Sequence, residues 1–164
     1  MRLSLLALVV LTACGSDDPY TEAGGLYAGD YIPVADDWLQ FGPTEAPADG
    51  PFLMIEVSAT EWELRQGVGW TEADSEEKLA TTTDDGLTLA GTTVLPGELS
   101  EGAEQGGATV LAMGDESVYY GTFALAARTT VPSGRFAGEW VFAPRIGPIL
   151  MTIDGQVWEL VYYE

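Results

Sequence analysis

Few residues in this chain could carry catalytic chemistry. The sequence has 164 residues, no histidine and a single cysteine, Cys14. Serine and cysteine nucleophiles are normally activated by a histidine base, and histidine is a frequent zinc ligand, so the composition excludes the common triads and most zinc sites. Ser75 and Lys78 could formally pair as nucleophile and base, but the composition of their segment indicates exposure to solvent.

Carboxylates are the remaining candidates for acid–base catalysis, because 26 residues are Asp or Glu. A glycosidase uses two carboxyl groups that flank one bond, and Glu56, Glu139 and Glu159 lie in segments typical of strands. The alternation of apolar residues places Glu139 and Glu159 on outward positions. Glu56 lies in a more apolar stretch and is expected to need a partner such as Arg65 or Arg135. We therefore expect no enzymatic activity, and a carboxylate-dependent hydrolase is the least favoured hypothesis.

The acidic pairs and the overall charge narrow the range of partners. Pairs occur at residues 17–18, 36–37 and 84–85, and none has the D-x-[DN]-x-[DN]-G spacing of a calcium loop. We expect solvated turns there, with at most diffuse binding of divalent cations, and no bound metal or other cofactor. The formal net charge of −20 repels polyanions, which excludes nucleic-acid binding.

The one cysteine follows a short apolar segment at the start of the chain. Arg2 precedes an apolar run from Leu3 to Leu11, which is too short for a membrane-spanning helix of about 20 residues and is typical of a signal peptide. The sequence L-T-A-C, ending at Cys14, resembles the lipobox of bacterial lipoproteins. That resemblance implies cleavage before Cys14, a diacylglycerol on its sulfur and an acyl chain such as palmitate on the new amino terminus. The alternative is an ordinary secreted protein with an unpaired cysteine, which an oxidising compartment disfavours.

These signals divide the chain into a signal peptide (1–13), a lipidated tether (14–25) and a β domain (26–164). The tether is small and polar, and as a coil it would hold the domain about 20 Å from the membrane. In lipoproteins of double-membrane bacteria the residue after the cysteine directs sorting, and Gly15 favours the outer membrane. We therefore expect a protein of the bacterial cell envelope, bound to the membrane through the acyl chains on Cys14.

The β domain is expected to be all-β, because period-two alternation recurs along it and helical periodicity is scarce. We predict a single antiparallel sheet of about ten short strands, curved or barrel-like, that buries its aromatic residues. Asp154 and Gly155 predict a two-residue hairpin turn, and residues 84–86 predict a hairpin with a bulge at Gly86. The expected strands are Leu26 to Val34, Phe52 to Ala59, Glu61 to Gln66, Lys78 to Thr83, Leu87 to Leu95, Ala108 to Met113, Ser117 to Leu125, Gly134 to Ala143, Ile149 to Ile153 and Gln156 to Tyr163.

Three longer stretches are expected to lie outside strands. Asp36 to Gly50 contains an aromatic pair among prolines and indicates a covering loop. Gly67 to Glu77 fits either an acidic loop or a helical turn capped by Thr71. Pro96 to Gly107 indicates a long connecting loop, and loops of that length are often functional.

The segment Gly138 to Ile149, G-E-W-V-F-A-P-R-I-G-P-I, resembles a hairpin found in several bacterial lipoproteins. In those proteins an aromatic strand ends in A-P or A-K, and a G-x-G turn leads into the return strand. Some belong to β-rich families of the half-barrel type that includes lipoprotein carriers, and others are acidic secreted proteins. Here Arg145 and Ile146 replace the first glycine of the turn, while Pro144 and Pro148 stiffen it. The resemblance implies a hairpin in this segment.

The five tryptophans admit two roles. Trp62, Trp140 and Trp158 lie in alternating strands, and we expect them in the core, since aromatic residues dominate packing in a small β domain. Trp38 and Trp70 border loops and are the candidate ligand-binding residues, for a lipid, glycan or peptide.

We predict a noncatalytic structural or interaction module whose partner is an envelope protein. The alternative is a carrier that holds a small apolar ligand in the curved sheet. A carrier needs a sizeable apolar hollow lined by strand residues, whereas side chains fill the same space in a structural module.

Overall fold

The structure is a computed structural model. It describes residues 26–33, 37–48, 50–58, 61–67, 73–78, 80–83 and 86–164. The expected signal peptide and tether, with Cys14, lie outside these residues, as does Trp70. The described part is built from β-strands and one short 3-10 helix, η1 (Ala28–Tyr31), which confirms the all-β class.

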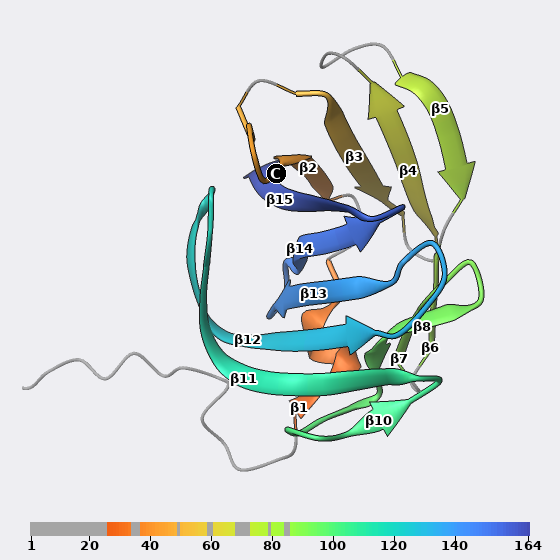
Figure 1. Ribbon diagram of the computed structural model, residues 1–164, viewed down its shortest axis with the longest axis vertical. Helices are drawn as coiled ribbons and strands as arrows, with labels where there is room; N and C mark the ends of the chain where they lie inside the picture. The colour runs from red at the N-terminus through yellow and green to blue at the C-terminus, as the bar shows by residue number, and fades with distance from the viewer. Residues whose placement is uncertain are drawn as a thin grey trace, which may run out of the picture.

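One large antiparallel sheet holds most of the strands (Figure 1). It has ten strands in a linear order, so the sheet is open rather than closed on itself, and Figure 1 shows that it is curved. In order across the sheet these are β10 (Glu104–Gln105), β11 (Ala108–Val118), β12 (Gly121–Val131), β13 (Gly138–Ala143), β14 (Gly147–Ile153), β15 (Gln156–Tyr163), β2 (Trp38–Pro43), β3 (Phe52–Val57), β4 (Trp62–Gly67) and β5 (Ala73–Lys78).

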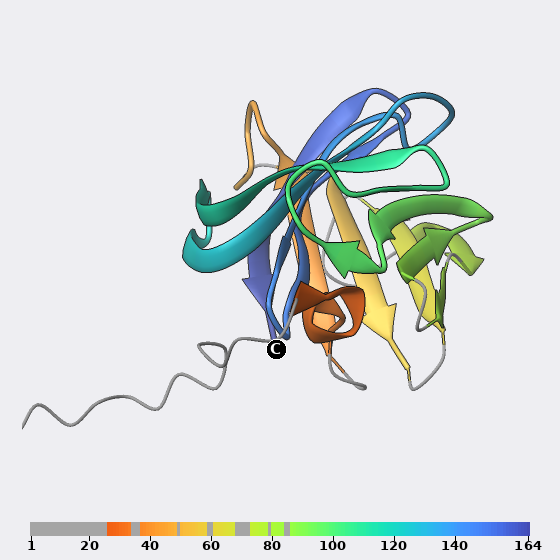
Figure 2. The same cartoon turned by 90° about the horizontal axis from the view of Figure 1, so that it is seen from below.

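Two smaller sheets complete the domain. One contains β6 (Ala80–Thr83), β7 (Gly86–Leu89) and β8 (Thr92–Pro96), and the other pairs β1 (Leu26–Tyr27) with β9 (Glu98–Leu99). Strand β8 lies against β11 and β12, and β7 lies beside η1 (Figure 2). Thr129 of β12 donates a hydrogen bond of 2.8 Å from its hydroxyl to the Val94 carbonyl oxygen of β8. We call the face of the large sheet that packs against β7 and β8 the inner face.

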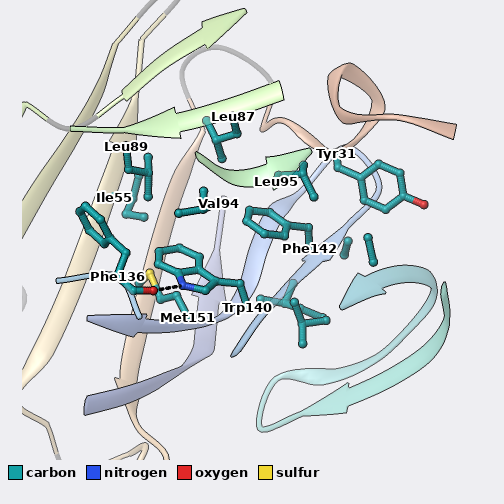
Figure 3. Close-up of a cluster of buried hydrophobic side chains, with 14 of the residues drawn as sticks. Tyr31, Ile55, Leu87, Leu89, Val94, Leu95, Phe136, Trp140, Phe142 and Met151 are labelled. Atoms are coloured by element: carbon teal, nitrogen blue, oxygen red, sulfur yellow. Dashed lines mark hydrogen bonds between the residues drawn. The ribbon is translucent and has the colours of Figure 1, made fainter. Parts of the chain in front are cut away.

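Aromatic side chains from the expected strand form the centre of the core. Trp140 lies between Phe136 and Phe142, with ring centroids 6.0 and 5.9 Å apart. Leu87 and Val94 of the small sheet pack on the side of this cluster that faces away from the large sheet (Figure 3). The indole Nε1 of Trp140 donates to the Phe136 carbonyl oxygen at 2.9 Å, so its one polar atom is satisfied inside the core. The strand expected from Gly134 begins only at Gly138, so Phe136 joins this cluster from the turn that precedes β13.

The hairpin turn predicted between the last two strands is also confirmed. Asp154 and Gly155 have φ angles of 51° and 79°, and the flanking residues Ile153 and Gln156 are paired. Positive φ at both central residues matches the right-handed twist of the strands, and Asp-Gly is a sequence that adopts it readily.

The expected covering loop from Asp36 to Gly50 is wrong, because its first half is strand β2 in the middle of the large sheet. Leu39 and Phe41 are buried on the inner face and pair with Ile55 and Leu53 of β3. The polar residue between them, Gln40, is buried as well, so the strand is covered on both sides at this point.

The expected loop or helical turn from Gly67 to Glu77 is also wrong for residues 73–77, whereas residues 68–72 lie outside the described residues. Residues 73–78 form β5, which pairs with β4 at one edge of the large sheet. Its sequence, A-D-S-E-E-K, has low strand propensity, and pairing with a neighbouring strand outweighs that preference. Charged residues are common on edge strands because they oppose pairing with another chain.

Other differences concern where strands begin and end. The expected strand from Leu26 continues only to Tyr27 before η1, and the loop from Pro96 to Gly107 contains the short strands β9 and β10. The expected strand Leu87 to Leu95 is divided by a turn at Ala90 and Gly91, whose φ angles are positive. The expected strands Ala108 to Met113 and Ser117 to Leu125 also differ, since β11 continues through residues 114–116 to Val118 and the turn lies at residues 119–120.

Packing around Trp140 predicts a large cost for truncating a neighbouring ring. Phe142→Ala should lower the free energy of unfolding by about 3–5 kcal/mol, because a fully buried ring is removed and a cavity is left. Leu111→Ala, at an exposed position of β11, is the control and should change it by less than about 0.5 kcal/mol. Denaturant unfolding measures both. Equal small effects would mean that the cluster is not the core.

Candidate functional site

The inner face, where a carrier would hold its ligand, is filled by side chains of the described residues. Phe41 and Leu160 of the large sheet and Leu87 and Leu95 of the small sheet are fully buried there. Tyr31 of η1 is also fully buried, and its hydroxyl donates to the Leu125 carbonyl oxygen at 2.6 Å. These side chains occupy the space that an apolar ligand would need.

A groove of about 470 Å³ opens beside this core, where β2 ends and β15 begins. Its lining is mixed in character: prolines and an alanine alternate with a carboxylate and two amides. The groove is open to solvent on one side and is therefore unlike the closed apolar hollow of a lipid carrier. The lining residues are Pro43, Glu45, Ala46, Gly50, Pro51, Gln66, Gln156 and Trp158.

Trp158 is the one aromatic residue of the groove, and it is only 5% exposed. Its indole Nε1 is buried without a hydrogen-bond partner among the described residues. Since that nitrogen is covered, a molecule lying in the groove does not reach it in this conformation. The burial of Trp62, Trp140 and Trp158 confirms the core positions predicted for them.

The three candidate glutamates each contact a different residue. Glu56 forms an ion pair with Arg65 at 2.9 Å, which confirms one of the two partners expected for it. Glu139 pairs with Arg128, and the Glu159 carboxylate accepts a hydrogen bond from the Tyr119 amide at 2.9 Å. Each carboxylate thus has its own partner rather than a shared one.

Arg128 joins three neighbouring strands of the large sheet. Its Nε and Nη2 atoms donate to the two carboxylate oxygens of Glu116 on β11, at 2.8 and 2.6 Å. Its Nη1 atom donates to Glu139 on β13 at 2.5 Å. The hydrogen bonds from Arg128 lower the pKa of Glu116 against the opposing effect of burial, and the same bonds raise the pKa of Arg128. Arg128 therefore forms a bidentate ion pair with Glu116 and a second ion pair with Glu139, which links β11, β12 and β13 through side chains.

Exposed aromatic side chains gather at the tip of the β11–β12 hairpin, where it reaches the end of β15 (Figure 1). Tyr120 lies 5.0 Å from Tyr163 and 6.3 Å from Phe123, measured between ring centroids. The Tyr120 amide donates to the Leu160 carbonyl oxygen at 3.1 Å, which holds the tip against β15. We define the tyrosine surface as Tyr119, Tyr120, Phe123, Tyr162 and Tyr163. It extends around the end of β15, because Tyr162 and Tyr163 pair with Gln40 and Leu39 and so project on opposite faces of the sheet.

Two carboxylates are hydrogen-bonded within the tyrosine surface. Glu159 accepts from the Tyr119 amide, and Glu164 accepts from the Tyr162 hydroxyl at 3.0 Å. The bond to the Glu164 carboxylate, together with its negative charge, raises the pKa of Tyr162. The surface therefore combines aromatic rings with negative charge.

The structure places Trp38, a predicted ligand-binding residue, at the margin of this surface. Trp38 and Glu164 exchange backbone hydrogen bonds of 2.9 and 3.0 Å, so they lie directly opposite each other on β2 and the chain end after β15. Directly opposite residues project on the same face of an antiparallel pair. Trp70 lies outside the described residues. The tyrosines themselves were missed, because the turn between β11 and β12 consists of Tyr119 and Tyr120 and contains none of the residues typical of turns.

Metal sites and membrane-spanning helices are absent from the described part of the chain. No group of three or more Asp, Glu or Cys side chains there could hold a metal ion. Within the same ranges, no helix has the length and apolar character required to cross a membrane.

No family model, curated protein or solved structure matches this chain.

The Arg128 cluster predicts how stability depends on pH. The pKa of Glu116 is lowered by folding, so its ion pair stabilises the fold fully above the ordinary value of 4.5, and this contribution is lost as the pH falls through the lowered value. Between about pH 6 and pH 3 the Glu116→Gln variant should lose about 1 kcal/mol less unfolding free energy than the wild type. Glu98→Gln, at an exposed position of β9, is the control and should follow the wild type. The free energy of unfolding is measured against pH for all three proteins. Parallel curves would show that the Glu116 ion pair does not cause the loss of stability at low pH.

Proposed function

We propose that this chain is a lipid-anchored, noncatalytic interaction module of the bacterial cell envelope. Acyl chains on Cys14 would bind it to the membrane, and the β domain would present a surface to an envelope protein. The filled inner face is the observation that carries this proposal, because it favours a module over a carrier. An exposed aromatic surface at the hairpin tip gives such a module a place to bind.

The carrier hypothesis receives less support from the same residues. The groove at Trp158 is lined by Glu45, Gln66 and Gln156 as well as by apolar groups. Burying a carboxylate or amide against an apolar ligand is unfavourable unless the polar atoms find new partners. A lipid therefore fits this groove poorly.

The proposed anchor predicts a defined change in mass and location. Intact-mass spectrometry of the membrane-extracted protein should find residues 14–164 plus acyl chains. Cys14→Ser should leave the protein out of the membrane fraction, since the thiol that receives the diacylglycerol is gone. Ser16→Ala, which keeps Cys14, is the matched control and should remain membrane-bound.

The same preparation tests the carrier alternative. Organic extraction of the purified wild-type protein should release only lipids that co-purify in the detergent micelle. Their molar ratio to the protein should not be fixed. A stoichiometric apolar ligand in the extract would favour the carrier instead. An unacylated wild-type protein would contradict the anchor and the envelope location together.

A further inference from the structure

We infer that the tyrosine surface docks a positively charged peptide segment, rich in Arg or Lys, of a partner protein. This inference rests on the proposed function, because it names the surface and the partner chemistry of the interaction module. It is argued from exposure, from the preorganisation of the rings and from charge.

Exposure sets this surface apart from the rest of the described chain. Among the described residues five large hydrophobic side chains are exposed, and three of them, Tyr119, Tyr120 and Tyr162, belong to the tyrosine surface, with exposed fractions of 57%, 44% and 38%. They come from segments 40 residues apart in sequence that meet at one place. Single exposed apolar residues are ordinary, whereas a gathered group marks an interaction site.

The rings are held in position before any partner arrives. Tyr120 packs against Phe123 and Tyr163, and its amide is bonded to the Leu160 carbonyl oxygen. Tyr162 is bonded through its hydroxyl to Glu164. Side chains that are already ordered lose little entropy on binding, and tyrosine supplies a large contact area with few rotatable bonds.

Charge selects the partner. Glu159 and Glu164 each use Oε2 in the hydrogen bonds of the surface, which leaves the other carboxylate oxygen of each residue to accept a further bond. Arg128 already holds Glu116 and Glu139 elsewhere on the sheet. With 26 acidic and 6 basic residues in the chain, the complementary partner is a cation.

Tyrosine faces and carboxylates together recognise Arg and Lys in particular. A guanidinium or ammonium group is attracted to the face of an aromatic ring, and a guanidinium also donates two parallel bonds to a carboxylate. The two carboxylates are held by different residues of the surface, Glu159 by Tyr119 and Glu164 by Tyr162, so a segment with spaced charges can engage both. Trp38 lies at the margin and extends the aromatic area toward β2.

The test is a titration of the full chain, extracted in a neutral detergent, with a fluorescent hexa-arginine peptide and with hexaglutamate. Hexa-arginine should bind, more weakly as salt rises, and hexaglutamate should not. The double variant Tyr120→Ala/Tyr162→Ala should raise the Kd for hexa-arginine about tenfold, because two ring faces are lost. Tyr27→Ala, which removes a tyrosine of 58% exposure outside the surface, should change the Kd by less than about twofold.

A second pair of variants separates local recognition from general attraction to an acidic protein. Glu159→Gln/Glu164→Gln should weaken binding about tenfold, while Glu98→Gln/Glu104→Gln, with the same change in net charge at exposed positions of β9 and β10, should have a small effect. Unfolding curves of all variants confirm that each is folded.

Equal weakening by both carboxylate pairs, or no effect of the tyrosine variant, would overturn the inference and leave diffuse electrostatics as the explanation. Neither result changes what is expected for the acylation of Cys14. The release of the Cys14→Ser variant from the membrane is also unaffected. A failed docking surface and a failed proposed function are therefore distinguishable.

Discussion

The packing of β7 and β8 against the inner face is the contact on which the rest of the structure depends. A ten-stranded open sheet with one apolar face cannot remain exposed to water, and here the small sheet and η1 cover that face. Apolar contacts are not directional, whereas the hydrogen bond from the Thr129 hydroxyl to the Val94 carbonyl oxygen joins the two sheets at one defined position. Because the cover is part of the chain, side chains of the described residues form a core on the inner face of the curved sheet.

The same packing decides which part of the long hairpin is free. Ala126, Ala127 and Thr129 of β12 are buried against the core, whereas the strand before them is half-buried or exposed. The change falls at Leu125, whose φ of 56° marks an irregular position and whose carbonyl oxygen accepts the Tyr31 hydroxyl. Beyond that point the hairpin leaves the small sheet and reaches β15. The tyrosine surface exists because the hairpin is longer than the core that supports it.

Residues whose strand character is local were predictable from the sequence. The Asp154-Gly155 turn needs only its own φ angles, and the alternation around Trp140 shows its face without knowledge of the neighbouring strands. Strands β2 and β5 were not predictable in this way. A buried Gln40 and an acidic edge segment become strands only through pairing with β3 and β4.

The tyrosine surface was beyond sequence reasoning for a related reason: its members lie on a hairpin turn and on the last strand, and only the tertiary fold brings them together. The high negative charge of the chain gives this surface its selectivity. Copies of the chain repel one another, which opposes self-association through exposed rings, although salt confines that repulsion to about 10 Å. A cationic segment is instead attracted to the acidic chain from a distance. Once bound, it contacts the aromatic rings and the carboxylates of the tyrosine surface. An exposed aromatic surface on an acidic protein thus favours one sign of partner and disfavours its own kind.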